Sequence, residues 1–275
     1  MPSIIDLDAE LARLTTFRRT PDATAAQRKG SVAQLASYRD GLLLAIKFSG
    51  HDHWERHLSG DELIHVLDGA ATLEIVCDEG PPRSFELGAG MIAVVPQGAW
   101  HRFHSSAGAT EIAVTPFPGE TIERDIPDPR AHSAQKETAM PTIIDVSAET
   151  AKLTMFHGRT PQTTFAERKG SAVHLGRYRD GMLLLGKSAG TGHWETHPAD
   201  ELLYVLDGTM TLDIVEQDSL QSFAVGAGMM AIVPPGAWHR VHSADGATVL
   251  SATIPGEHID LDIDDPRTVA LAAQP

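Results

Sequence analysis

The sequence predicts an all-β protein made of two tandem domains, each of them a small sandwich or barrel. The chain has 275 residues and contains a sequence repeat, since "MPSIIDLDAE" at Met1 returns as "MPTIIDVSAE" at Met140. Within each copy, short apolar or alternating runs are typical of β-strands. Gly and Pro interrupt these runs at intervals of about ten residues, which is the turn spacing of small sandwiches and barrels.

The repeat extends along the whole chain. "GAGMIAVVPQGAWHRFHS" at Gly88 returns as "GAGMMAIVPPGAWHRVHS" at Gly226, and "DIPDPR" at Asp125 returns as "DIDDPR" at Asp262. This period is far longer than that of a solenoid repeat, so each copy is expected to be a domain. The predicted organisation is an N-terminal domain at 1–130, a linker at 131–139 and a C-terminal domain at 140–275.

The expected elements follow in chain order. Helix is confined to "LDAELARL" at Leu7 and to its copy, and the polar segment 20–30 is expected to be a loop or arm. Inside the run 90–103, Pro and Gly set a turn and the His after them starts a new strand. The runs that favour strands are 41–50, 62–76 and 90–103, together with their copies.

Composition excludes several classes of partner. The net charge is −15, from 37 acidic and 22 basic residues, which argues against binding to nucleic acid or to an anionic membrane surface. No apolar run approaches 18 residues, so no transmembrane segment is expected. Cys77 is the single cysteine, so no intrachain disulfide can form, and the absence of a signal-peptide pattern favours a cytoplasmic protein.

A cluster of His and Glu lies on one of these strand-like segments. In "HDHWERH", read as a strand, His51, His53, Glu55 and His57 share one face because side chains alternate. Residues two apart lie about 6.6 Å apart along a strand and can converge on one ion, whereas residues four apart, at about 13 Å, cannot. Glu55 can therefore chelate an ion with His57 or with His53.

Two further residues can reach the same place. A tight turn at "LSGD" returns Glu62 beside His57, and in a barrel the strand opened by His101, after "PQGAW", can cross to the same site. The second copy repeats this set as Glu195, His197, Glu201 and His239.

The spacing of these residues resembles the two motifs of the cupin superfamily. The resemblance covers both copies and implies two double-stranded β-helix barrels, of the jelly-roll type, in tandem. The chain is therefore similar to the bicupins. The residues that match are Glu55, His57, Glu62, Gly69, Gly90, Pro96, Gly98 and His101, and in the second copy Glu195, His197, Glu201, Gly208, Gly228, Pro234, Gly236 and His239.

One departure concerns the metal. Cupins usually bind an ion through three His and one Glu, whereas Glu55 and Glu195 replace the first of these His. The resemblance then implies a divalent transition metal, Fe, Mn, Zn or Ni, held by two His and up to two carboxylates. The alternatives are that Glu55 and Glu195 contact substrate, and that Glu62 and Glu201 face solvent at a hairpin.

Other polar residues are weaker candidates. His53 and His193 are either substrate contacts, hydrogen-bond donors to a ligand, or structural residues. Lys47 and Lys187 either point into the barrel toward an anionic substrate or extend along the surface. The residues expected at the surface, in solvent or at an interface, are Arg28, Lys29, His104, Arg168, Lys169 and His242.

The favoured function is a metal-dependent enzyme that acts on a small organic molecule, most simply in a dioxygenase-type reaction. Any of Glu55, Glu62, Glu195 and Glu201 that does not bind the ion can transfer a proton. The alternatives are non-redox isomerase, cyclase or decarboxylase chemistry, or a non-catalytic small-molecule sensor. The resemblance also implies a homodimer paired by sheet edges, although two barrels in one chain can satisfy each other.

Overall fold

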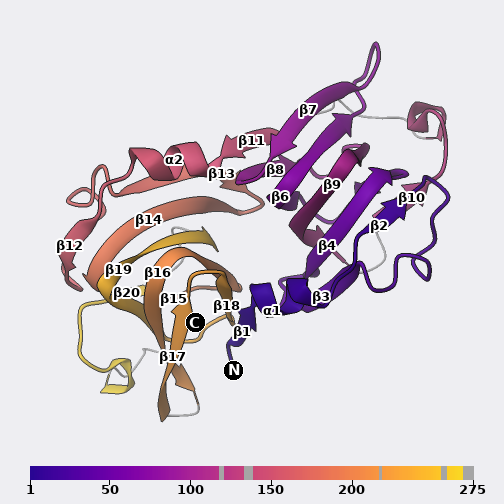
Figure 1. Cartoon of the computed structure of the whole chain (residues 1–275). Helices are drawn as coiled ribbons and strands as arrows, with labels where there is room; N and C mark the ends of the chain where they lie inside the picture. Colours follow the sequence, from indigo (N-terminus) through magenta and orange to yellow (C-terminus); the bar gives the residue numbers. More distant parts are fainter. Residues whose placement is uncertain (118–120, 133–138, 217–218, 255–258, 269–275) are drawn as a thin grey trace, which may run out of the picture. The chain divides into compact units, whose positions relative to one another are not determined.

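A computed structural model of the chain describes residues 1–117, 121–132, 139–216, 219–254 and 259–268. It is mostly β and divides into two compact units, each built around a ten-stranded sheet (Figure 1). The unit Asp8–Ala148 is called here the first barrel, and the unit made of Met1–Leu7 and Glu149–Pro275 the second barrel. No helix among the described residues is long and apolar enough to cross a membrane.

In the first barrel, the long strand β9 pairs with β4, β5 and β6, and so joins most of the sheet. The expected runs 41–50 and 62–76 are confirmed as β4 and β6, and the Pro-Gly turn divides the third run into β8 and β9. Its strands are β2 (Phe17–Arg19), β3 (Val32–Tyr38), β4 (Gly41–His51), β5 (Trp54–His57), β6 (Glu62–Ile75), β7 (Arg83–Gly88), β8 (Met91–Val95), β9 (His101–Pro116), β10 (Thr121–Arg124) and β11 (Thr142–Asp145).

The second barrel repeats this arrangement, with β19 paired to β14, β15 and β16. Within the described ranges, helices are confined to α1 (Leu7–Ala12) and α2 (Val146–Lys152), where they were expected, and to the 3-10 turns η1 (Pro129–His132) and η2 (Pro266–Thr268). Its strands are β1 (Ser3–Asp6), β12 (Phe156–Arg159), β13 (Ala172–Tyr178), β14 (Gly181–Thr191), β15 (Trp194–Thr196), β16 (Glu201–Glu216), β17 (Ser219–Gly226), β18 (Met229–Val233), β19 (His239–Thr253) and β20 (Ile259–Leu261).

The first strand of each repeat belongs to the sheet of the other repeat. β1 pairs antiparallel with β18, with Ser3 opposite Ile232, and β11 pairs antiparallel with β8, with Thr142 opposite Val94 (Figure 1). The compact units therefore differ from the predicted boundaries, which follow the sequence repeat. Most of the predicted linker, 133–138, lies outside the described residues.

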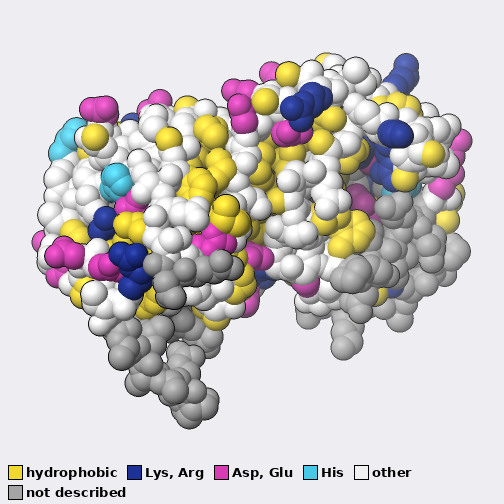
Figure 2. All heavy atoms as spheres, turned by 90° about the horizontal axis from the view of Figure 1, so that it is seen from below, with side chains coloured by type: hydrophobic (Ala, Val, Ile, Leu, Met, Phe, Trp, Pro, Cys, Tyr) yellow, Lys and Arg dark blue, Asp and Glu magenta, His cyan; other side chains and the backbone are white. Residues whose placement is uncertain are grey.

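Alternating apolar side chains form a packed core in each barrel. In the first barrel Ile46 and Phe48 of β4 pack with Leu73 and Phe103, and in the second barrel Leu203 and its neighbours form the matching cluster. The tryptophans beside the metal motifs are buried: Trp54, Trp100 and Trp194 are each 1% exposed. On the face that Figure 2 presents, Lys and Arg side chains lie among Asp and Glu.

The predicted continuous strand from His51 to His57 is interrupted. β4 ends at His51 and β5 starts at Trp54. Between them, the buried Asp52 side chain accepts a hydrogen bond from the backbone N–H of His53 at 3.0 Å. Because the chain turns here, His53 does not continue the row of side chains that carries Glu55 and His57.

Gly69, a residue of the first cupin-like motif, is required by a close approach of two backbones. Its φ is +74°, and a Cβ atom there would lie 2.1 Å from the carbonyl oxygen of Gly108. Gly80 has a similar φ of +79°, but no atom lies within 4 Å of its would-be Cβ. Both glycines have a positive φ, but only Gly69 would bring a Cβ into a steric clash. A comparison of substitutions at the two positions therefore distinguishes the free-energy cost of the clash from that of the backbone conformation.

We expect Gly69→Ala to destabilise the first barrel by about 3 kcal/mol or more, because it adds a clash with backbone to a strained φ. Gly80→Ala, the matched control, should cost only about 1 kcal/mol. The free energy of unfolding in urea, followed by circular dichroism, measures both. Equal costs for the two variants would contradict the close-approach explanation.

Candidate metal centres and the cavity of the second barrel

Four side chains converge inside the first barrel. Glu55 and His57 alternate along β5 to the same face, Glu62 opens β6, and His101 opens β9 directly opposite Glu55. The Pro-Gly turn is held in place because the N–H of Gly98 donates to the carbonyl of His57 at 2.7 Å. One ligand atom from each of the four residues lies within 4.8 Å of all the others.

Distances within this cluster are short. Glu62 Oε2 lies 3.0 Å from His101 Nε2 and 3.2 Å from His57 Nε2, and Glu55 Oε1 lies 3.8 Å from His101 Nε2. The hydroxyl of Thr115 donates to the other oxygen of Glu62 at 2.6 Å. The alternative that Glu62 faces solvent is therefore wrong, since its side chain is 5% exposed and lies close to both imidazoles.

The second barrel holds the same constellation. Glu201 Oε2 lies 3.0 Å from His239 Nε2 and 3.7 Å from His197 Nε2, and Glu195 lies 3.9 Å from each of these rings. Again the four donors lie within 4.8 Å of one another. Glu201 is buried here as Glu62 is in the first barrel, so the solvent-facing alternative is wrong for both residues.

Burial and neighbouring charges shift the pKa values in opposite directions. Burial raises the pKa of Glu55, and the charge of Glu62 adds to this. Burial also raises the pKa of Glu62, but His57 and His101 outweigh it, so that its net pKa is below the ordinary value. Burial lowers the pKa of His239, yet its hydrogen bond to Glu201 and the nearby carboxylates raise the net value to about 9.

The donor chemistry fits a divalent transition metal. His101 Nδ1 lies 3.0 Å from the carbonyl oxygen of Ala99, and His239 Nδ1 lies 3.0 Å from that of Ala237. A carbonyl oxygen can only accept, so Nδ1 carries a proton, and Nε2 is the ring nitrogen that can bind an ion at the centre of the cluster once its own proton is displaced. Two imidazole nitrogens and two carboxylates within one small space are a ligand set for Fe, Mn, Zn or Ni.

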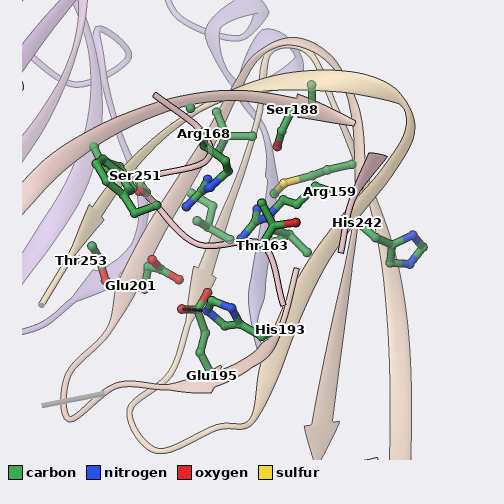
Figure 3. Close-up of a pocket in the computed structure, with 18 of the residues that line it drawn as sticks. Arg159, Thr163, Arg168, Ser188, His193, Glu195, Glu201, His242, Ser251 and Thr253 are labelled. Carbon is green, nitrogen blue, oxygen red and sulfur yellow. Dashed lines mark ion pairs between the residues drawn. The ribbon is translucent and has the colours of Figure 1, made fainter. Parts of the chain in front are cut away.

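A cavity of about 690 Å³ opens beside the second cluster, and Glu195, His197 and Glu201 form part of its wall. Figure 3 shows two guanidinium groups, those of Arg159 and Arg168, on the side of the cavity opposite Glu195 and Glu201. The volume is within the range of about 300–1,000 Å³ that small-molecule sites occupy. The rest of the wall is largely apolar and includes Met182, Leu184, Leu203, Val241 and Val249.

The arginines are what the sequence interpretation missed. Arg168 was expected to be solvated, but it is half-buried in the cavity wall, because the loop that follows β12 turns back over the barrel. Arg159 at the end of β12 was not singled out at all. The available signal was that both arginines recur in the first repeat, as Arg19 and Arg28.

The weaker substrate candidates fare differently. His193 lines the cavity, with Nε2 3.6 Å from Glu195 Oε2, whereas His53 Nδ1 lies 3.2 Å from Asp52 Oδ1. Lys187 lies on the opposite face of β14 from the cavity, since the lining residues are its neighbours Gly186 and Ser188. Of its two expected orientations, the inward one toward a substrate is therefore wrong.

Lys47 likewise alternates with Ile46 and Phe48, which pack in the first core, so it faces away from that interior. His242 is 37% exposed and its ring points away from the cavity in Figure 3, in agreement with the predicted surface position.

A family model described as "Cupin domain" matches the chain twice, at residues 44–115 and 181–253. The chain belongs to the cupin family. Among curated proteins, the acireductone dioxygenases of Rhodopseudomonas palustris strains TIE-1 and ATCC BAA-98 / CGA009 are each 40% identical to this cupin chain over 68 residues. That match covers 25% of this chain and 38% of each relative, so the chain spans well under half of their length.

Solved structures of similar fold include oxalate decarboxylase from Bacillus subtilis at pH 4.6 and a variant of the same enzyme. The TM-scores are 0.51 and 0.52, the identities are 12% and 13%, and each match covers 84% of this chain. The matches cover 73% and 74% of those chains. At this level of identity the similarity concerns the fold alone, and it agrees with two cupin barrels in tandem.

We expect the purified chain to bind close to two divalent ions, one per cluster. His101→Ala and His239→Ala should each leave one ion, because each removes an imidazole that no other side chain of the cluster replaces. Equilibrium dialysis against Zn(II) followed by elemental analysis measures the stoichiometry. Zn(II) at about 100 times its Kd should also stabilise the fold by about 2.7 kcal/mol for each occupied site.

His104→Ala is the matched control, since His104 lies three residues beyond His101 and stacks on His51 instead of joining the cluster. It should retain two ions. If both single ligand variants also retained two ions, the assignment of these clusters as metal centres would be wrong.

Proposed function

We propose that this cupin is a metal-dependent enzyme that acts on a small organic molecule in a dioxygenase-type reaction. The ligand set carries the proposal, because two His with carboxylate ligands leave positions at an ion open for substrate and O2. The local similarity to acireductone dioxygenases supports the same reaction class.

The chain's own residues would hold the ion and shape the reaction. Glu62 with His57 and His101, and Glu201 with His197 and His239, form the tightest donor groups in their barrels. When bound, the ion would supply Lewis acidity toward a substrate oxygen and, if redox-active, reactivity toward O2. Apolar walls such as Leu184 and Leu203 exclude water from the site.

Glu195 is the residue best placed to move a proton. It lies farther than Glu201 from the imidazole of His239, and its side chain is 22% exposed where that of Glu201 is 7% exposed. Burial raises its pKa, but the hydrogen bond from His193 and the nearby imidazoles lower the net value to about 2, so it is ionised at neutral pH. A carboxylate with so low a pKa is a weak base, so Glu195 Oε2 would accept a proton from a substrate that the bound ion makes more acidic, while His193 orients the carboxylate.

The test loads the chain with Fe(II) without air and adds nitric oxide, which occupies the positions that O2 needs. We expect an iron–nitrosyl signal by electron paramagnetic resonance, and O2 uptake with at least one member of a panel of small enolisable organic acids. His239→Ala should reduce uptake in the reactive barrel by about a hundredfold or more, and His104→Ala should not change it.

Substrate conversion without O2 uptake would replace the dioxygenase reaction with non-redox chemistry. Metal loading without either a nitrosyl signal or conversion of any compound would leave a small-molecule-binding cupin in place of an enzyme.

A further inference from the structure

The two barrels keep the same metal donors but have different interiors. Where the first barrel has Ile46 and Phe48 on β4, the second has Gly186 and Ser188 on β14. Phe48 is fully buried, whereas Gly186 and Ser188 line the 690 Å³ cavity. Large side chains in one barrel and small ones in the other therefore occupy matching positions on the wall beside the metal centre.

A second difference concerns the charge of the interior. On β9, Glu111 pairs with Ile46 across the sheet and is 2% exposed, while its counterpart in the second barrel is the apolar Val249. Burial raises the pKa of Glu111 to about 8, and the acids around it add to this, although Arg19 acts in the opposite direction. An organic anion would find an additional acid in the first barrel and an apolar wall in the second.

The third difference concerns the partner of an arginine that the two barrels share, Arg19 in the first and Arg159 in the second. In the first barrel the guanidinium of Arg19 forms a buried ion pair with Asp52 and stacks on Phe48, with Cζ 4.7 Å from the ring centroid. Both partners are buried, at 6% and 2% exposure, so Asp52 already neutralises this cation. The second barrel has Gly192 in place of Asp52.

Arg159 and Arg168 have no such partner in the part of the chain that the structure describes. Among the described residues, no carboxylate forms an ion pair with either, and the buried Nε atoms of both have no hydrogen-bond acceptor. Glu195 is the acid whose charge acts on them. A buried guanidinium costs free energy unless an anion meets it, and its planar fork matches a carboxylate.

We propose that the second barrel alone binds the organic substrate, and that this substrate is an organic anion whose acid group is held by Arg159 and Arg168. Its apolar body lies against Leu184, Leu203 and Val249 while its reactive end faces Glu195 and His193. On this proposal the first barrel, with the bulkier Ile46 and Phe48 beside its metal donors, takes no substrate. This inference rests on the proposed function of the metal centres and adds the substrate class and the barrel that takes it.

The test uses the full chain loaded with Zn(II), which supports binding without redox chemistry. Isothermal titration with acetate, oxalate, succinate and benzoate, each against its neutral amide, measures affinity and stoichiometry. We expect one carboxylate per chain and weaker binding of the amides. Arg159→Gln and Arg168→Gln should each weaken carboxylate binding at least about tenfold, as the loss of a charge-assisted hydrogen bond predicts.

Arg28→Gln is the matched control, since Arg28 is the counterpart of Arg168 in the first repeat, and it should leave carboxylate affinity unchanged. Gly192→Asp reproduces the first barrel's arrangement, because a Cβ at this position would lie 3.1 Å from Nη2 of Arg159. This variant should lose carboxylate binding yet retain two Zn(II) per chain.

The outcomes separate the two proposals. Failure to load Zn(II) in the unmodified chain would overturn the metal centres themselves. Three results obtained with normal Zn(II) loading would overturn the assignment of an anionic substrate to the second barrel. They are the binding of two carboxylates per chain, equal affinity for acids and amides, and no saturable binding of any of the acids.

Discussion

Charge buried inside a β-barrel is the constraint on which the rest of this protein depends. Each barrel places two carboxylates and two imidazoles within 4.8 Å of one another, three of the four in buried positions. Carboxylates in such a place are costly unless cations or hydrogen bonds match them. A divalent ion at the centre supplies that match, and backbone carbonyls such as that of Ala99 fix the imidazoles that face it.

The same constraint explains why one substitution changes several contacts at once. Asp52 binds the guanidinium of Arg19, accepts from the backbone of His53 and lies close to its ring. With Gly192 at the matching position, His193 instead lies 3.6 Å from Glu195, and Arg159 faces the cavity. The presence or absence of this one carboxylate therefore accounts for the difference between the barrels. With Asp52, the arginine and the histidine contact that side chain; with Gly192, both line a cavity.

Much of the metal-donor cluster could be predicted from the sequence, because its geometry follows from short, local patterns. The strand alternation that puts Glu55 and His57 on one face, the turn before Glu62 and the Pro-Gly bend before His101 all lie close in sequence. The strand exchange could not be predicted, since β1 and β11 have nearly the same sequence, SIID and TIID, and each fits either sheet. Arg168 lies in a turn, where strand alternation gives no orientation.

Retention of four metal donors in the first barrel, where Ile46 and Phe48 stand in place of Gly186 and Ser188, has a physical reason that does not involve a substrate. Ions bind the folded cluster and not the unfolded chain, in which Glu62 and His101 are far apart, so binding contributes directly to folding. Loss of one donor would leave the remaining buried carboxylate poorly matched. Large side chains can therefore replace small ones beside the metal donors of the first barrel, while the cost of unmatched buried carboxylates still maintains those donors, as it does in the second barrel.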